Sequence, residues 1–346
     1  MLNKYCYEAL DKCFKDILRF SNAFKPNAPF GGKVVFLEVL RLTENMRLRG
    51  CSQDIRDVEL KKFADWILNL GDGLLGDSSD GESVIRIPEK LLFNFESPSL
   101  HDLVLFVYPD ILLHISSADY FKDKSILAPT LDVVTEVNNH VMSLLLGNER
   151  VYLSSDTLLN EDGHLESELY TMSTESLNAL NCSGIPQHKL VLKIGVPVML
   201  LRNIDQSNGL CNGTWMQVRR LGDHVIECVI LAGRNVCKVV LIPRMNMIPN
   251  NETLLIRFIR RQFPIMLCFA MAINKSQGQT LSTVGVYLSR PVFTHDQLCV
   301  ALFRVNSMSG LKILIIDSNG TASNHTLNIV YRKVFVNLFS PLQSLL

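Results

Sequence analysis

The sequence lacks the features that mark several large classes of protein. Its longest apolar run, Phe263 to Ile273, is about half the ~20 residues that a membrane-spanning helix requires. Its 9 cysteines are scattered, without a C-x-x-C pair or a Cys/His group at zinc spacing. The first residues, MLNKYC, lack the charged and apolar regions of a signal peptide. These absences argue against membrane, zinc-stabilised and disulfide-rich secreted proteins, and they predict a soluble, intracellular chain with reduced cysteines.

A surplus of charge of either sign is also missing, because 34 basic and 34 acidic residues balance to zero. A protein that coats nucleic acid would normally be basic overall, so any contact with DNA must come from a local patch. Length and apolar content, by contrast, are ample. The 346 residues suffice for two or three units of roughly 100–200 residues each, and 47% of them are hydrophobic, enough for buried cores.

The spacing of apolar residues changes along the chain. In the first half it predicts helices over residues 1–24, 54–70 and 131–146, short strands over 33–37 and 125–129, and a loop over 71–82. After residue 191, short strands separated by Gly, Asn and Asp turns are predicted over residues 196–201, 214–221, 225–231 and 238–242. The final part returns to an α/β pattern, with strands over 265–273, 284–288 and 311–317 and helices over 274–281 and 296–303. The predicted architecture is an α/β sheet interrupted by a small β-rich module.

The segment AMAINKSQGQTL, residues 270–281, is the most informative for chemistry. A buried strand leads into a polar turn, and the same turn is predicted to open a helix. Free N–H groups at a helix start, together with Lys275, Ser276 and Thr280, are chemically suited to phosphate. The alternative is an ordinary strand–turn–helix unit whose polar residues are only solvated.

Two arginines are further candidates. Arg304 ends the predicted helix 296–303, where it could stabilise charge on a transferring phosphoryl group or simply complement the helix dipole. Arg47 lies in a polar turn that, taken alone, is only a charged turn.

The order and joint occurrence of these segments resembles the petite-integration-frequency (Pif) family of DNA helicases, especially its plant and Helitron-type members. The resemblance covers nearly the whole chain. It is carried by LTENMRL (42–48), LAPT (127–130), SGIPQHKLVLKIGVPVMLLRNID (183–205), GLCNGT (209–214), AMAINKSQGQTL (270–281) and VALFRVNSMSGLKILI (300–315).

The resemblance implies a fold and a domain order. Residues 1–36 would be a remnant of a first RecA-like motor domain, and residues 37–182 and 263–346 would form the second RecA-like domain. Residues 183–262 would be an SH3-like β-barrel inserted in it, which helps to hold and separate strands. A scaffold insert without DNA contact is the alternative for this barrel.

The resemblance also implies an ATP-dependent DNA helicase that uses ATP and Mg²⁺ and unwinds DNA in the 5′–3′ direction. It implies roles in DNA repair, recombination and telomere maintenance, a nuclear or mitochondrial location, and single-stranded or forked DNA as partner. Arg47 and Arg304 match the two arginines that reach the terminal phosphate of the nucleotide. Contact with nucleic acid is implied for Pro129, Thr130, Lys275, Ser276, Gln277, Gly278 and Thr280.

Several parts of the family pattern are missing from these residues. No G-x-x-x-x-G-K-[ST] loop is present, since Gly32-Lys33 is followed by Val34 and has Asn27 in place of the first glycine. The acidic pair that binds Mg²⁺ and the segment that senses the γ-phosphate are not recognisable either. Phe303 stands where relatives have a small serine, and Ala272 where they more often have threonine.

Because catalysis of phosphoryl transfer is mostly positioning and charge stabilisation by such a loop and metal, we expect negligible ATPase activity from this chain alone. Three alternatives remain: a helicase fragment, a non-catalytic single-stranded DNA-binding module, and a protein-interaction module built on the β-rich stretch.

Overall fold

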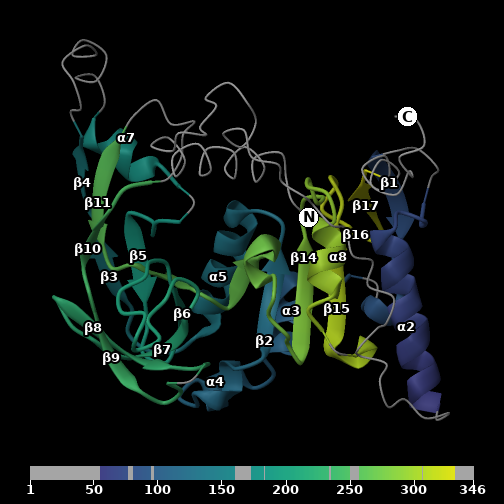
Figure 1. Cartoon of the computed structure of the whole chain (residues 1–346), viewed down its shortest axis with the longest axis horizontal. Helices are drawn as coiled ribbons and strands as arrows, with labels where there is room; N and C mark the ends of the chain where they lie inside the picture. Colours follow the sequence, from purple (N-terminus) through teal and green to yellow (C-terminus); the bar gives the residue numbers. More distant parts are fainter. Residues whose placement is uncertain are drawn as a thin grey trace, which may run out of the picture. The chain divides into compact units, whose positions relative to one another are not determined.

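A mixed five-stranded sheet forms the centre of the α/β part of the protein (Figure 1). The structure is a computed structural model that describes residues 55–76, 81–94, 97–159, 173–182, 184–233, 235–249, 257–305 and 307–331, all within one unit, Gly50–Asn337. The strand order is β13-β2-β14-β15-β16, with the first four strands parallel and the last antiparallel. The bounds are β13 Ala270–Ala272, β2 Lys124–Ala128, β14 Thr283–Leu288, β15 Leu311–Ile316 and β16 Ala322–Ser323.

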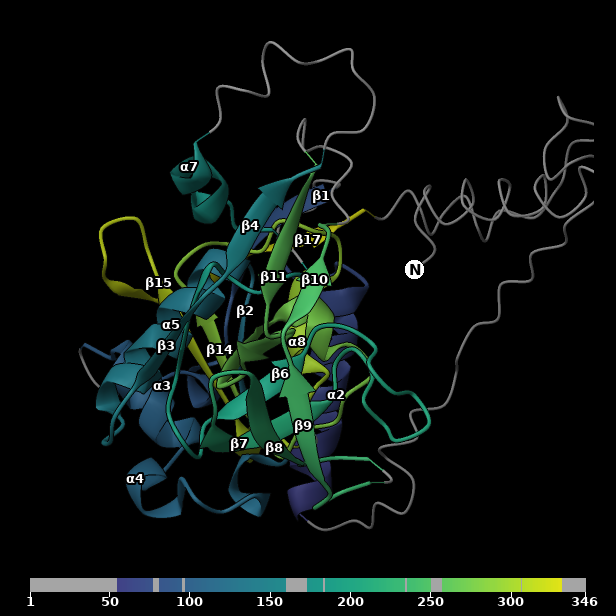
Figure 2. The same cartoon turned by 90° about the vertical axis from the view of Figure 1, so that its left-hand side faces the viewer.

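The parallel strands are covered on both faces, which is why their sequences are near-continuous apolar runs. Helices α3 and α5 lie to one side of the sheet, and α8 and α2 lie to the other (Figure 2). Gly285 of β14 allows α3 to approach closely, because a Cβ there would come within 2.8 Å of the Val107 side chain. The helix bounds are α2 Ile55–Gly71, α3 Leu100–Val107, α5 Leu131–Leu144 and α8 Gln297–Leu302.

A second, antiparallel sheet in the order β12-β6-β7-β8-β9 closes into a small barrel through two bent strands. β9 continues after Arg244 into β10, and β11 continues after Phe263 and Pro264 into β12. Since β10 pairs with β11, the strand pairing returns from β9 to β12. The bounds are β6 Pro197–Leu200, β7 Trp215–Leu221, β8 Val225–Ile230, β9 Val239–Pro243, β10 Met245–Met247, β11 Phe258–Gln262 and β12 Ile265–Leu267. The four strands predicted between residues 196 and 242 are therefore present.

Strand pairing around the barrel reaches further back along the chain than the predicted insert. β3 (Arg150–Leu153) pairs with β5 (Lys189–Leu192), and β4 (Ser155–Leu158) pairs with β11. Both β3 and β4 precede residue 183, the predicted start of the insert. The domain boundaries stay predictions.

The segment 265–281 departs from its predicted structure in two ways. The single strand predicted over 265–273 is two strands, because β12 pairs with β6 in the barrel whereas β13 pairs with β2 in the parallel sheet. The helix predicted over 274–281 is only a four-residue 3-10 turn, η5 (Ile273–Ser276). Gly278, with a φ of 82°, lies in the left-handed region, where a helix cannot continue. The chain uses this stretch to cross from the end of β13 to the start of β14.

An antiparallel pair at the edge of the unit was not predicted. β1 (Gly81–Arg86) pairs along its length with β17 (His325–Val330), and the buried Asn328 amide donates to the Leu70 carbonyl at the end of α2. Of the helices in the described ranges, none combines the length and apolarity that a bilayer crossing requires. The helix predicted over 1–24, the strand over 33–37 and Arg47 lie outside the described residues. The shorter elements are η3 Glu89–Leu91, α4 Ile111–His114, η4 Asp119–Phe121, α7 Thr174–Ala179 and η6 Met308–Gly310.

Candidate nucleic-acid interface

The predicted DNA-contacting residues follow two neighbouring strands at one edge of the parallel sheet. Ala128, the last residue of β2, is the register partner of Ala272, the last residue of β13. Paired strands lie about 4.8 Å apart, so the chain segments that leave them start side by side. Pro129 and Thr130 follow β2, and the turn with Lys275 follows β13. The structure thus brings together two segments that are far apart in sequence, at the edge where α/β sheets commonly bind ligands.

Thr130 begins α5 without capping it. Its side chain makes no capping hydrogen bond, and its buried hydroxyl oxygen has no partner among the described residues. The first N–H groups of a helix also lack partners within the helix. Pro129 is buried, and its carbonyl accepts a hydrogen bond from Gln297 Nε2 at 3.2 Å. Pro129 therefore anchors this segment, the Thr130 hydroxyl is buried without a described partner, and the start of α5 has N–H groups without partners in the helix.

The residues of the turn after β13 divide into two kinds. Ser276 is fully buried, and its hydroxyl donates to the Ile273 carbonyl at 2.7 Å, which closes the 3-10 turn. Gln277, Gly278 and Thr280 are exposed, and a Cβ at Gly278 would meet nothing within 4 Å. Of the predicted contacts, Ser276 holds the turn, and the exposed three are accessible to a ligand.

Lys275 is a half-buried cation. Its Nζ lies 3.6 Å from Met266 Sδ, and no ion pair of the described residues includes it. Burial lowers the pKa of this ammonium below its ordinary value. The neighbouring Cys268 offers no compensating charge, because burial raises the pKa of its thiol to about 12. An anion supplied by a ligand would stabilise the charged form of Lys275.

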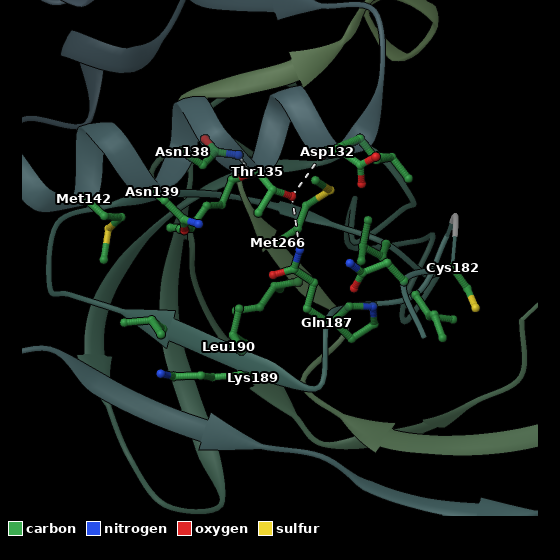
Figure 3. Close-up of a pocket in the computed structure, with 18 of the residues that line it drawn as sticks. Asp132, Thr135, Asn138, Asn139, Met142, Cys182, Gln187, Lys189, Leu190 and Met266 are labelled. Carbon is green, nitrogen blue, oxygen red and sulfur yellow. Dashed lines mark hydrogen bonds between the residues drawn. The ribbon is translucent and has the colours of Figure 1, made fainter. Parts of the chain in front are cut away.

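Lys275 is one of the residues that line a cavity of about 550 Å³. Other lining residues come from α5, from the segment 181–193 and from β12, as the labelled Thr135, Gln187 and Met266 show (Figure 3). Thr135 Oγ1 donates to the Leu131 carbonyl at 2.9 Å and accepts from Gln187 Nε2 at 3.0 Å, which links α5 to the opposite wall. The buried Asn138 ties α5 to the point where the chain changes sheets, since its Oδ1 accepts from Ala270 N at 2.9 Å. The cavity wall formed by α5 is therefore fixed to the start of β13, the strand that the polar turn follows.

Arg304 donates hydrogen bonds to the backbone of the turn that contains Lys275. Its Nη1 donates to the carbonyls of Ser276 and Gln279, at 3.3 and 3.0 Å, and its Nε donates to the carbonyl of Val300. The described geometry thus uses part of its guanidinium to hold the crossing segment between β13 and β14. Contact of Arg304 with a nucleotide phosphate stays a prediction.

Comparison with known proteins shows a likeness to Pif1 helicases. The family model described as "DNA helicase Pif1, 2B domain" matches residues 175–221, which include β5, β6 and β7. A human protein named ATP-dependent DNA helicase PIF1 is 38% identical over 188 residues, 54% of this chain and 28% of that protein. Its zebrafish (Danio rerio) namesake is 33% identical over 147 residues, 42% of this chain and 22% of that protein. The crystal structure of Pif1 helicase from Candida albicans is similar over 85% of this chain and 58% of that one, with a TM-score of 0.51 and 25% identity.

The chain is similar to part of the Pif1-family DNA helicases, as its sequence motifs predicted. Its mixed α/β unit with a partly parallel sheet is a partial RecA-like fold, as predicted. The chain spans about a quarter of the length of the curated Pif1 relatives it matches.

The names of the Pif1 relatives state a dependence on ATP, and an ATP site needs groups that hold phosphate and a metal ion. Among the described residues, no group of three or more His, Cys, Asp or Glu side chains is placed to hold a metal ion. No phosphate-binding loop of the G-x-x-x-x-G-K-[ST] type occurs in the sequence, and Arg304 bonds to backbone carbonyls. These residues do not by themselves make up an ATP–Mg²⁺ site.

One structurally important residue of this chain was missed by sequence reasoning. Arg260 on β11 is fully buried, and its guanidinium bonds both carboxylate oxygens of Asp156 at 2.7–3.1 Å. It also donates to the carbonyls of Leu177, Leu180 and Pro186. Two of these carbonyls precede the cavity-lining segment 181–187 and the third lies within it, so Arg260 holds one wall of the cavity. The signal was available in the strand pattern, because Arg260 lies between Phe258 and Gln262 on the inward face of β11.

Proposed function

We propose that this chain forms the second motor half of an ATP-dependent DNA helicase. It would bind single-stranded DNA at the ends of strands β2 and β13. The observation that carries the proposal is Lys275. A half-buried ammonium without a carboxylate partner costs free energy, and a DNA phosphate would supply the missing anion. Thr130 and the first N–H groups of α5 follow the neighbouring β-strand, β2. They are further donors for the bound DNA.

The zero net charge of the chain sets the expected strength of this contact. Binding would rest on a local patch with few phosphate contacts, so we expect weak, salt-dependent affinity. A Pif1 from Bacteroides has been crystallised bound to single-stranded DNA, and this makes DNA the partner to test first.

We further propose that Arg304 couples the DNA-binding turn to a nucleotide held mainly by residues of another motor domain. Its bonds to the Ser276 and Gln279 carbonyls mean that a shift of the guanidinium toward a phosphate would release the crossing segment next to Lys275. A phosphate contact of Arg47 remains an implication of the family resemblance, and this residue lies outside the described ranges. ATP and Mg²⁺ would then belong to the complete motor, which by family would act in repair, recombination or telomere maintenance in the nucleus or mitochondria.

Equilibrium binding of a labelled single-stranded oligonucleotide to the full chain, at several salt concentrations, tests DNA binding. We expect Lys275→Gln to weaken binding about tenfold and to reduce the slope of log affinity against log salt by about 1. Lys61→Gln, at an exposed lysine on α2, is the matched control and should change neither quantity. Equal losses in the two variants, or no binding by the unmodified chain, would contradict the proposal.

ATP hydrolysis separates the motor half from a complete motor. The 346 residues contain no phosphate-binding loop, so we expect no DNA-stimulated turnover from this chain alone. Stimulated turnover that is lost in Arg304→Ala would show instead that a nucleotide site exists within it.

A further inference from the structure

The buried residues that line the cavity beside Lys275 are mostly apolar. Its volume of about 550 Å³ lies in the range of pockets that hold small organic groups. Leu190, Ile265 and Leu201 are almost fully buried, and Met266 and Leu267 complete the floor. Met142 and Met266 place polarizable thioethers among the lining residues, and thioethers make favourable contacts with flat aromatic rings.

The cavity lining carries charges of both signs, and its three lysines are Lys189, which is exposed, and the half-buried Lys193 and Lys275. Lys193 is already engaged, because its Nζ donates to the Met142 and Leu145 carbonyls at the end of α5. The carboxylates of Asp132 and Glu149 also line the space. Lys275 is thus the one half-buried lysine of the lining left for an anion by the described contacts, and it follows β13 at the sheet edge. The arrangement suits an uncharged group within the cavity that is attached to an anionic group at the edge.

The rim of the cavity carries amides with unused hydrogen-bonding capacity. The side chains of Asn139 and Asn181 are exposed and have no hydrogen-bond partner among the described residues. Gln187 uses its Nε2 on Thr135 (Figure 3), which leaves its carbonyl oxygen available. Each amide offers both a donor and an acceptor, as the edges of nucleobases do.

We propose that this cavity accepts one nucleobase of a bound single strand while Lys275 holds the adjoining phosphate. The inference rests on the proposed DNA binding and adds a base-binding site to it. A base in a single strand has no pairing partner to lose, so its transfer from the strand into the cavity costs little. The rotatable amides accommodate different base edges, so the site contributes affinity with little sequence preference.

Abasic DNA tests the proposal on the full chain. We compare a thymidine oligonucleotide with one of the same length and charge whose bases are replaced by tetrahydrofuran. The unmodified protein should bind the thymidine strand about 5- to 10-fold more tightly, the range expected for contact with a single base. Asn139→Trp, which places a large ring at the cavity mouth from an exposed helical position, should reduce that preference to below about twofold without weakening binding of the abasic strand.

The control for Asn139→Trp is Asn69→Trp, the same change at an exposed position of α2, which should keep the preference. Lys275→Gln should weaken binding of both strands equally, because it removes a phosphate contact. Equal affinity of the unmodified protein for the two strands would overturn the base site and leave the proposed DNA binding intact. An equal loss of affinity for both oligonucleotides in Asn139→Trp would also overturn the base site. If the unmodified protein bound neither oligonucleotide, both proposals would be overturned.

Discussion

The barrel and the edge of the parallel sheet each bury a cationic side chain, but the two cations have different bonding partners. Arg260 in the barrel is fully buried and bonded to a carboxylate and three carbonyls. Lys275 at the sheet edge is half-buried and has only a methionine sulfur within hydrogen-bonding reach among the described residues. The two environments differ in their consequence. A buried charge whose partners all come from the fold stabilises the structure, whereas a buried charge without such partners is stabilised when a ligand supplies the opposite charge.

The largest effect should follow from breaking the buried pair. Arg260→Met leaves the Asp156 carboxylate and three carbonyls without their partner, and we expect a loss of about 3–5 kcal/mol in the free energy of unfolding. Urea denaturation measures it. The paired change Arg260→Met with Asp156→Leu should recover part of the loss, because it removes both charges together. A loss below about 1 kcal/mol for the single variant would mean that the cluster is not the main support of the cavity wall.

Arg304 has bonding partners intermediate between those of Arg260 and Lys275, because the partners described for it are backbone carbonyls. Its effect on stability should be intermediate as well. Arg304→Ala removes donors from the Ser276 and Gln279 carbonyls, and we expect a loss of about 1–3 kcal/mol. Hydrogen exchange should become faster in residues 276–282 than in β11. Unchanged exchange in that segment would contradict a role for Arg304 in holding it.

The pH dependence of DNA binding should report on Lys275. Burial lowers the pKa of its ammonium, so the proton is lost below the ordinary value of about 10.4, and the phosphate contact is lost with it. We expect affinity for single-stranded DNA to fall by up to about tenfold between neutral pH and pH 10, whereas Lys275→Arg keeps its charge and should show a flat profile. Parallel profiles in the two proteins would assign the pH effect to another group.

Stability should respond to Lys275 in the opposite sense from Arg260. Because the folded pKa is lowered, the unfolded chain binds the proton more strongly, and stability rises as pH rises between the folded and unfolded pKa values. Lys275→Met should therefore raise the free energy of unfolding at neutral pH, by up to about 1 kcal/mol, and abolish this rise. Destabilisation would show that the ammonium has protein partners that stabilise it.

The smallest effect is expected for an exposed ion pair. Lys90 and Glu59 are joined at 2.8 Å, but their side chains are 71% and 57% exposed. Lys90→Gln should leave the urea midpoint within experimental error, since solvent already screens the pair. A clear shift would blur the contrast with Arg260, because it would mean that pairing alone, without burial, stabilises this fold.

The sequence predicted local structure well for segments that pair within a single sheet. The buried runs at β2, β14 and β15 and the turn-separated strands β6 to β9 lie within a few residues of their predicted positions. It failed where a segment serves two sheets, as at 265–273, and where pairing joins distant segments, as between β1 and β17. Local periodicity carries no information about which partner a strand will meet.

The candidate site shows the same division. The motifs in the sequence indicated Pro129, Thr130 and the turn from Lys275 to Gly278, and the register of β2 with β13 brings these segments together. The sequence did not indicate that Ser276 is buried or that Arg304 bonds to the turn, because both depend on how the crossing segment packs against α8.

By itself the sequence determined the α/β class, the β-rich insertion, the family resemblance and the strand ends that carry polar residues, since apolar spacing and motif order record these directly. Tertiary structure alone decided which cation is satisfied and which is not. The Arg260–Asp156 pair joins residues 104 positions apart, and the surroundings of Lys275 come from α5, β12 and the turn after β13 together. The energy of a buried charge depends on the partners that folding brings to it, and no local pattern of residues contains that information.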